Sequence, residues 1–366
     1  MPKFYEVYGR DVYDSSEDAV NERKAAYCPF IENTCDGGGN RHQTKIKLNN
    51  SELRSFFDSE LSTVIPGICS IQYGEESWVV CPRRLLGFFS KLESMPELNS
   101  SLHGHEREAL LKAGLPKNVE LGVWPEVYLQ YGDDDTSINY HFDFVVAPIQ
   151  RKKSFSWLLD NYDISDEAEI EILKAAAKKG KYLKGRYDPE KEQEVLPDLV
   201  SPIIIEVMTA STSGSDKEAG TDIASSFTDA IQGREHNCPG INKRQVWGRM
   251  ATQLFAKSAL AEEWGGKTVW LVQDQLLKNI ELTTKLNLDE SNEESRGTIN
   301  FLSMSYDTGE KGINSLRFKK YSEKNAGLDF SGNKKATDIL LPKVHPDKKV
   351  LLKAVLRRKL SAVILL

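Results

Sequence analysis

The chain has 366 residues, of which 40% are hydrophobic and 28% charged, and its formal net charge is −6. This composition is typical of a globular protein with a sizeable core, and it excludes an intrinsically disordered chain. The N-terminus lacks the basic and apolar regions of a signal peptide, and no apolar run is long enough to span a bilayer. We therefore expect a cytoplasmic protein without a membrane partner. Its closing residues, 360–366, predict a packed strand or helix end.

Charge is distributed unevenly along the chain. Residues 311–359 hold 14 Lys or Arg against 4 Asp or Glu, whereas acidic residues are concentrated in residues 160–171 and 289–294. An acidic total argues mildly against a nucleic-acid partner, but a basic surface can coexist with it. A solvated charged face without any partner is the alternative interpretation.

The first hundred residues hold most of the cysteines. Four of the five fall within residues 28–81, namely Cys28, Cys35, Cys69 and Cys81. Without an export signal, metal ligands or buried thiols are more plausible than a disulfide framework. The spacings of six, 33 and 11 intervening residues are not the paired C-x-x-C pattern. Four thiolates can nevertheless close a tetrahedral site around zinc or iron. Four unrelated buried cysteines are the alternative.

A helix and two strands are predicted next. Residues 82–118 predict helical structure that stops at Gly114. Residues 127–131 and 138–146 are rich in aromatic and β-branched side chains and are separated by a Gly-Asp-rich turn. This pattern predicts two neighbouring strands of a meander.

The second half of the chain continues the alternation. Residues 150–200 predict an insertion that contains a helix over residues 165–180. A strand over residues 202–208, a helix over 242–264 and a strand over 267–272 follow. Strand, helix and strand in this order predict a right-handed crossover onto one sheet.

Two carboxylates lie on successive predicted strands. Asp143 interrupts the strand over 138–146, where Asp is disfavoured, and Glu206 follows three isoleucines in the strand over 202–208. An ionised carboxylate beside such an apolar run is costly to desolvate unless a cation or hydrogen-bond donors face it. If the strands pair, both side chains can bind Mg²⁺ through oxygen, and Mg²⁺ can activate water to attack a phosphodiester.

Seven short motifs resemble, in the same order, those of the NotI-type restriction endonucleases, which have the PD-(D/E)XK fold. They are Tyr8-Gly-Arg-Asp-Val-Tyr, Cys28-Pro-Phe, Gly67-Ile-Cys, Trp78-Val-Val-Cys-Pro-Arg-Arg-Leu, Phe142-Asp-Phe, Ile205-Glu-Val-Met-Thr and Gly214-Ser-Asp-Lys-Glu-Ala-Gly-Thr-Asp-Ile. Each motif is weak alone, but seven in register cover most of the chain. The resemblance implies an α/β, restriction-endonuclease-like core with a mixed central sheet flanked by helices, and a small N-terminal four-cysteine metal-binding module.

The resemblance also assigns roles to residues. The four cysteines match a site that in similar enzymes holds iron, with zinc as the alternative here, while Asp143 and Glu206 match the catalytic, Mg²⁺-binding carboxylates. Met208 falls on the third catalytic position, which similar enzymes fill with Lys or Gln. Met208 can neither orient water nor contact phosphate well, so Gln253, Lys257 and Lys217 are candidates to replace it.

We expect a homodimer acting on double-stranded DNA, because two-fold symmetry suits a palindromic site. Four basic residues are candidates for DNA contact: Arg83, Arg84, Lys152 and Lys153.

The expected organisation is a cysteine module over 1–105, a nuclease core over 106–290 that includes the insertion, and a basic, DNA-facing part over 291–366. The expected function is that of a Mg²⁺-dependent type II restriction endonuclease cutting a specific, palindromic, GC-rich site. A sequence-specific DNA-binding protein with a weakened or silenced site is the first alternative. A nonspecific repair or recombination nuclease is the second.

Overall fold

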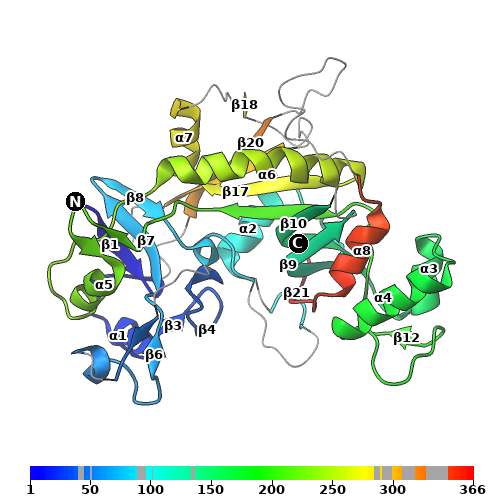
Figure 1. Ribbon diagram of the computed structural model, residues 1–366, viewed down its shortest axis with the longest axis horizontal. Helices are drawn as coiled ribbons and strands as arrows, with labels where there is room; N and C mark the ends of the chain where they lie inside the picture. Colours follow the sequence, from blue (N-terminus) through cyan, green and yellow to red (C-terminus); the bar gives the residue numbers. More distant parts are fainter. Residues whose placement is uncertain are drawn as a thin grey trace.

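The computed structural model describes residues 1–39, 45–49, 52–88, 96–100, 102–132, 137–283, 289–290, 299–306, 318–326 and 345–366. Within these ranges the chain is a mixed α/β protein with eight α-helices (Figure 1). None of the helices in the described ranges has the length and apolar character needed to cross a membrane. Most of the expected basic part over 291–366 lies outside the described residues.

A nine-stranded mixed sheet forms the centre of the molecule. Its strand order is β18-β20-β19-β17-β14-β10-β9-β21, with β13 paired to β10 as well. The strands are β9 (Leu121–Tyr131), β10 (Ile138–Gln150), β13 (Leu196–Pro197), β14 (Ile203–Met208), β17 (Lys267–Gln273), β18 (Asp289–Glu290), β19 (Ile299–Tyr306), β20 (Phe318–Ala326) and β21 (Ala362–Ile364). The pairs β14–β17 and β17–β19 are parallel and the others antiparallel.

The strands predicted from aromatic and β-branched runs are confirmed. The expected strand over 127–131 is the end of the longer β9, and the expected strand over 138–146 extends as β10 to Gln150. The isoleucine run forms β14, which is almost entirely buried because β10 and β17 pair with its two edges and helices cover the faces of the sheet. The closing residues form β21, which pairs with β9, so the expected packed strand is confirmed.

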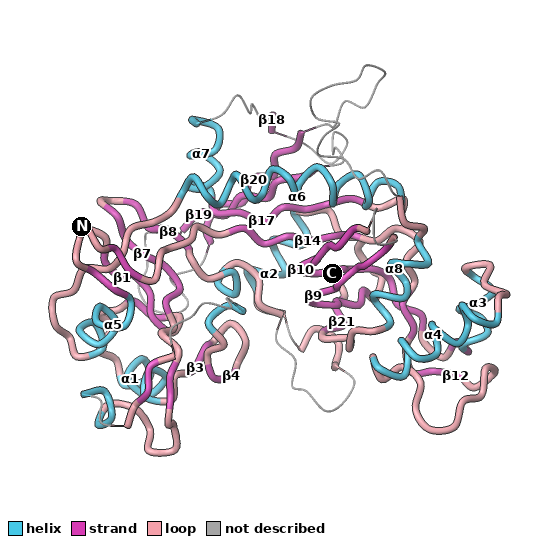
Figure 2. The backbone as a smooth tube through the Cα atoms, in the orientation of Figure 1, coloured by secondary structure: helices cyan, strands magenta, loops and turns pink. Residues whose placement is uncertain are grey.

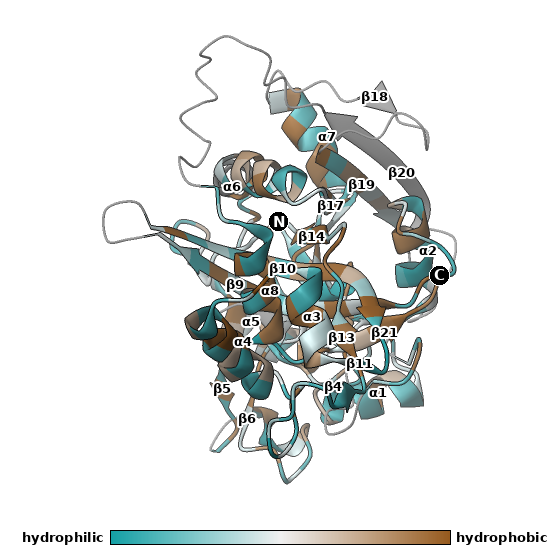
Figure 3. Ribbon diagram, turned by 90° about the vertical axis from the view of Figure 1, so that its right-hand side faces the viewer, coloured by the Kyte–Doolittle hydropathy of each residue, from teal (hydrophilic) through white to brown (hydrophobic). Residues whose placement is uncertain are grey.

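Helices cover both faces of the sheet. The longest, α6 (Lys243–Glu263), runs alongside β14 and β17 (Figure 2). The helix α2 (Gly104–Lys112) lies on the opposite side of the sheet from α6 (Figure 3). The other helices are α1 (Glu17–Lys24), α3 (Phe155–Asn161), α4 (Glu167–Lys179), α5 (Ile223–Ile231), α7 (Asp274–Thr283) and α8 (Lys348–Leu356). The connection from β14 through α6 to β17 joins parallel strands, as predicted.

The helical prediction for residues 82–118 is wrong over much of its length. Only α2 and a short 3-10 helix, Pro82–Arg84, form among the described residues of this range. The insertion contains two helices instead of one, because Ser154 caps α3 and Asp166 caps α4 through hydrogen bonds to backbone N–H groups. Both helices pack with α8 in one apolar core.

The N-terminal region builds a four-stranded sheet of its own. Its order is β2 (Arg10–Asp11), β1 (Lys3–Val7), β7 (Ile68–Tyr73) and β8 (Glu76–Val79). Short pairs also form between β3 (Tyr27–Cys28) and β4 (Asn33–Thr34), β5 (Ile46–Lys47) and β6 (Thr63–Val64), β11 (Lys153–Ser154) and β12 (Glu192–Gln193), and β15 (Ser215–Asp216) and β16 (Thr221–Asp222). The apolar side chains of β1 and β7 share one core with α5, α6 and β17. The region is therefore packed onto the central sheet and does not depend on a core of its own.

Gly266 allows the end of α6 to approach β14 closely. A Cβ at Gly266 would lie 1.9 Å from the carbonyl oxygen of Pro202. We expect Gly266→Ala to lower the free energy of unfolding by about 1–3 kcal/mol, since the backbone would have to shift. Gly248→Ala, on an open position of α6, is the matched control and should stabilise by about 0.5–1 kcal/mol. Urea unfolding of both variants tests this, and a fully stable Gly266→Ala protein would contradict it.

Candidate functional site

Asp143 and Glu206 meet where β10 pairs with β14. The two strands pair antiparallel with Phe144 opposite Ile205. One further step in the same register brings Asp143 opposite Glu206, and directly opposed residues project from the same face of a sheet. The Asp143 carboxylate turns toward β14 and accepts a hydrogen bond of 2.8 Å from the N–H of Val207. The pairing that the sequence required for a two-carboxylate site is therefore present.

The Glu206 carboxylate is buried and only half satisfied. Its side chain is 5% exposed, and its Oε2 accepts from the Lys257 ammonium at 2.5 Å, which itself is 2% exposed. The other oxygen, Oε1, is buried and has no hydrogen-bond partner among the described residues. Since an unsatisfied buried carboxylate oxygen is costly, this atom is the natural place for a cation or water.

The surroundings of both site carboxyl groups disfavour their ionised forms. Burial raises the pKa of the Glu206 carboxyl to about 8, the nearby Asp143 adds to the rise, and the Lys257 ammonium opposes it. Burial also raises the pKa of Asp143, while the N–H of Val207 opposes this rise. A bound divalent cation would favour the ionised form of both groups.

The donor set fits Mg²⁺. This ion is commonly held by one or two carboxylates, with water and substrate phosphate completing its shell. Across the described ranges, no group of three or more His, Cys, Asp or Glu side chains is placed to hold a metal. The site is thus a two-carboxylate site, with the unpartnered oxygen of Glu206 as its open position.

The candidates for the third catalytic position lie in different places. Met208 is 7% exposed and packs in the apolar core beneath α6. Gln253 is exposed on α6, whereas Lys257, one turn further along the same helix, reaches Glu206. Lys217 is exposed in the β15–β16 hairpin. Of these, Lys257 is the residue whose contact with a site carboxylate is observed.

The four predicted cysteine ligands converge within the N-terminal region. Cys28, Cys35 and Cys69 pack in one cluster. Cys81 lies against the loop that follows Cys35. A Cβ added at Gly38 of this loop would be 3.0 Å from the Cys81 sulfur. All four cysteines are free thiols. Thiolates are ligands that iron and zinc accept. Among the described residues, however, the four cysteines are not arranged as a group that could hold a metal ion.

The environment of the cysteine sulfurs is uneven. The Cys35 thiol is hydrogen-bonded to Cys28, which lowers the pKa of Cys28 and raises that of Cys35. Burial raises the pKa of Cys69 and brings that of Cys81 to about 12. Backbone N–H groups of Gly9 and Gly37 point at sulfur atoms, at 3.2 Å and 3.4 Å. Such donors stabilise thiolates, as they do around metal clusters.

The expected DNA-contacting residues separate into exposed and buried ones. Lys152 and Lys153 are exposed at the turn after β10, with the Lys153 ammonium 5.7 Å from the centre of the Trp157 ring. Arg83 is partly exposed and pairs with Asp36 at 3.2 Å. Arg84 was expected to contact DNA, and the structure corrects this prediction. Its side chain is 1% exposed and therefore cannot reach a phosphate at the surface.

Arg84 belongs to a buried network that the sequence did not reveal. Its Nε donates to Glu6 at 3.0 Å, and the other oxygen of Glu6 accepts from Ser70 at 2.6 Å and from Tyr306 at 2.5 Å. The guanidinium also lies over the rings of Phe30 and Tyr306, 5.1 Å and 5.3 Å from their centres. Because Tyr306 belongs to β19, the network joins the N-terminal sheet to the central sheet.

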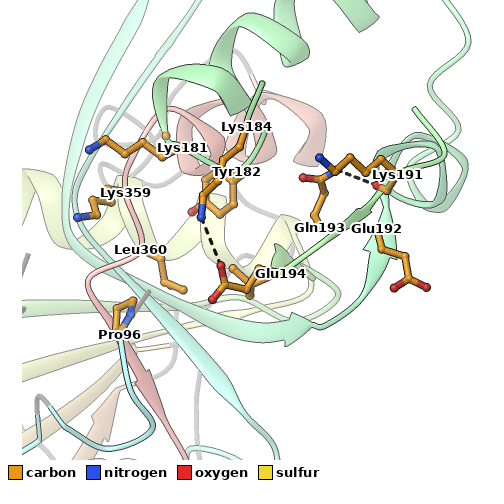
Figure 4. A pocket seen from close by; sticks show the side chains of 12 residues that line it. Pro96, Lys181, Tyr182, Lys184, Lys191, Glu192, Gln193, Glu194, Lys359 and Leu360 are labelled. Carbon is orange, nitrogen blue, oxygen red and sulfur yellow. Dashed lines mark hydrogen bonds and ion pairs between the residues drawn. The ribbon is translucent and has the colours of Figure 1, made fainter. Parts of the chain in front are cut away.

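A cavity of about 210 Å³ lies away from the carboxylates, between α4, β12 and the start of β21 (Figure 4). Its lining includes four lysines, Lys181, Lys184, Lys191 and Lys359. Lys184 pairs with Glu194 at 3.4 Å, and both side chains are largely exposed. Asp143, Glu206 and Lys257 do not line this cavity. The candidate site is therefore the carboxylate pair, not this hollow.

Comparison of the chain with known protein families, with curated proteins and with solved structures gives no match.

Proposed function

We propose that the chain is a divalent-metal-dependent endonuclease that hydrolyses phosphodiester bonds in double-stranded DNA. The observation that carries the proposal is the buried, unpartnered oxygen of Glu206 beside Asp143 on paired strands. Two carboxylates with an open oxygen, held on rigid neighbouring strands, suit a hydrolytic metal site. The motifs that resemble restriction endonucleases support the same chemistry.

Asp143 and Glu206 would hold Mg²⁺. The ion, when bound, supplies a water of lowered pKa and neutralises charge on the phosphate. In hydrolysis, the water oxygen bonds to phosphorus as the bond from phosphorus to the leaving ester oxygen breaks. The attacking water loses a proton, and the leaving oxygen gains one. The two strands fix the carboxylates in place, and burial excludes bulk water around Glu206.

The substrate we propose is a specific, palindromic and GC-rich site, cut by a homodimer. Two active sites related by a two-fold axis suit the two strands of a symmetric duplex. Arg83, Lys152 and Lys153 are the exposed or partly exposed cations proposed to contact phosphate, which positions the protein without reading bases. Steep loss of affinity with added salt is expected for such contacts.

The four cysteines are proposed to hold iron, with zinc as the alternative. A bound metal would stabilise the segments that bear Cys28, Cys35 and Cys81, because metal binding and folding are coupled. Elemental analysis of purified protein is expected to find close to one iron or zinc per chain. Cys69→Ser should lose it, whereas Cys238→Ser, a buried cysteine outside the cluster, should keep it. Metal-free wild-type protein that folds normally would contradict the proposal.

Cleavage of genomic and plasmid DNA tests the function. With Mg²⁺ the wild-type protein should give discrete fragments, and Asp143→Ala should give none. Sequencing the fragment ends would then give the recognition site and the cut position.

Met208 at the third catalytic position favours one further candidate, a DNA-binding protein with a silenced site. For that candidate, the protein should retard DNA in an electrophoretic mobility-shift assay but should not cleave it in Mg²⁺ or Mn²⁺. A smear that Asp143→Ala removes would instead indicate a nonspecific nuclease.

A further inference from the structure

We propose that Lys257 of α6 is the catalytic cation of this site, in place of Met208 on β14. This assignment rests on the proposed nuclease function and adds the residue that would contact the attacking water. It follows from the buried position of the Lys257 ammonium and from the face of β14 from which Glu206 and Met208 both project.

The Lys257 ammonium is held at the carboxylates by three features. It donates to Glu206 Oε2 at 2.5 Å, it is 2% exposed, and it lies 5.6 Å from the centre of the Phe142 ring. A lysine is rarely buried unless it is paired, and the aromatic face stabilises the charge further. An ammonium has three N–H donors, of which one is used on Glu206. Within the part of the chain that the structure describes, Glu206 is the one hydrogen-bond partner of this ammonium.

The ammonium is bound to the carboxylate oxygen next to the open one. Glu206 presents Oε2 to Lys257 and leaves Oε1 unpartnered. Water bound at the Oε1 side would therefore be within reach of the ammonium. A donor placed there stabilises the negative charge that develops on the attacking oxygen, and such preorganised donors act strongly in a buried site.

A lysine at position 208 of β14 could place a positive charge at the same carboxylate. Side chains alternate along a strand, so Met208 projects from the same face of β14 as Glu206. It packs there among apolar side chains that include Met250 and Leu254 of α6. On this face of the sheet, α6 therefore contributes the Lys257 ammonium, whereas β14 contributes only the uncharged thioether of Met208.

Relocating the lysine tests the assignment. We expect Lys257→Met, which keeps an unbranched side chain one atom shorter and removes the charge, to lower the cleavage rate at saturating DNA and Mg²⁺ by about 10²–10³-fold. Binding of the same DNA in Ca²⁺ should change less than about threefold, because Lys257 is buried and does not dock the duplex. The double variant Met208→Lys/Lys257→Met should recover at least about tenfold of the lost rate. Gln253→Lys/Lys257→Met, which adds a lysine on an exposed position of α6, should recover none.

Two readouts separate this role from a merely structural one. Circular dichroism and thermal unfolding establish that each variant is folded. Mn²⁺ affinity without DNA, measured by calorimetry, should change in Lys257→Met and return toward the wild-type value in the Met208→Lys double variant. That return is expected because the local charge beside Glu206 is restored.

The outcomes distinguish the two proposals. If wild-type protein cuts no DNA with Mg²⁺ or Mn²⁺, the nuclease function fails and the assignment of Lys257 fails with it. If wild-type protein cuts and folded Lys257→Met cuts within threefold of it, only the assignment fails. The assignment is also overturned if both double variants recover equally or not at all, since Lys257 would then serve only to hold α6 on the sheet.

Discussion

Asp143→Asn is expected to abolish Mg²⁺-dependent cleavage while making the metal-free protein more stable. The amide oxygen of Asn can still accept from the N–H of Val207, so the strand contact survives. In the wild-type protein, the negative charge of Asp143 disfavours the ionised form of Glu206. The substitution removes this charge. We expect loss of at least about 10²-fold in cleavage and a gain of about 1 kcal/mol in unfolding free energy. Plasmid cleavage and thermal unfolding without metal measure the two effects.

The same variant should alter how stability depends on pH. The folded protein holds the pKa of Glu206 at about 8, whereas an unfolded Glu titrates near 4.3. Between these values the folded state binds more protons, so stability is greatest at the acid end of the range and falls as pH rises toward 8. Asp143→Asn should flatten this fall, because it removes one cause of the raised pKa.

Two controls accompany Asp143→Asn. Asp160→Asn, on an exposed aspartate at α3, should change neither cleavage nor stability. Added Mg²⁺ should raise the unfolding temperature of the wild-type protein, because a ligand of the native state stabilises it, and should not do so for Asp143→Asn. A less stable or normally active Asp143→Asn protein would refute the electrostatic account of the site.

Glu6→Ala is expected to be the most destabilising single change among those considered. It leaves the Arg84 guanidinium buried without its carboxylate, and it removes the acceptor of Ser70 and Tyr306. Removing one partner of a buried pair typically lowers stability by about 3–5 kcal/mol. Because the network joins β1 and β7 to β19, the loss should loosen the N-terminal sheet from the central one. Urea unfolding gives the free energy.

The companion variants decide whether charge or packing is responsible. Glu6→Leu/Arg84→Met replaces both charges with apolar groups and should recover most of the loss, as replaced buried pairs often do. Lys3→Ala breaks the exposed pair with Glu235 and should have little effect. Equal losses in Glu6→Ala and in the double variant would show that the shape of the network matters more than its charge.

Local pattern was sufficient to predict the strands that carry the candidate site. A strand is predicted by the isoleucine run before Glu206, and another by the alternation of aromatic residues around Asp143. Each pattern also indicates the face of the strand from which the carboxylate projects. Their pairing then brings the two carboxylates together. The prediction failed for 82–118, where Gly87 needs close approach to the backbone of Phe30, a tertiary contact that no local helix pattern reveals.

Long-range contacts explain what the sequence left open. The sequence offered two residues of α6, Gln253 and Lys257, as candidates to replace Met208. Only the packing of the helix shows that Lys257 contacts Glu206 whereas Gln253 is exposed. In the same way, adjacent arginines are alike in sequence, yet Arg84 is buried against Glu6 while Arg83 remains near the surface. The deciding partners lie 51 residues away for Lys257, which contacts Glu206, and 78 residues away for Arg84, which contacts Glu6.

The exit of β14 is joined to the cysteine region through backbone hydrogen bonds. The N–H of Ala210 donates to Val79 at 3.0 Å, and the N–H groups of Val80 and Cys81 both donate to Cys69 at 3.0 Å and 3.2 Å. Segments linked in this way open as one cooperative unit. Slow amide exchange at Ala210 should therefore report on the cysteine cluster, and oxidation of those thiols should loosen the strand that carries Glu206.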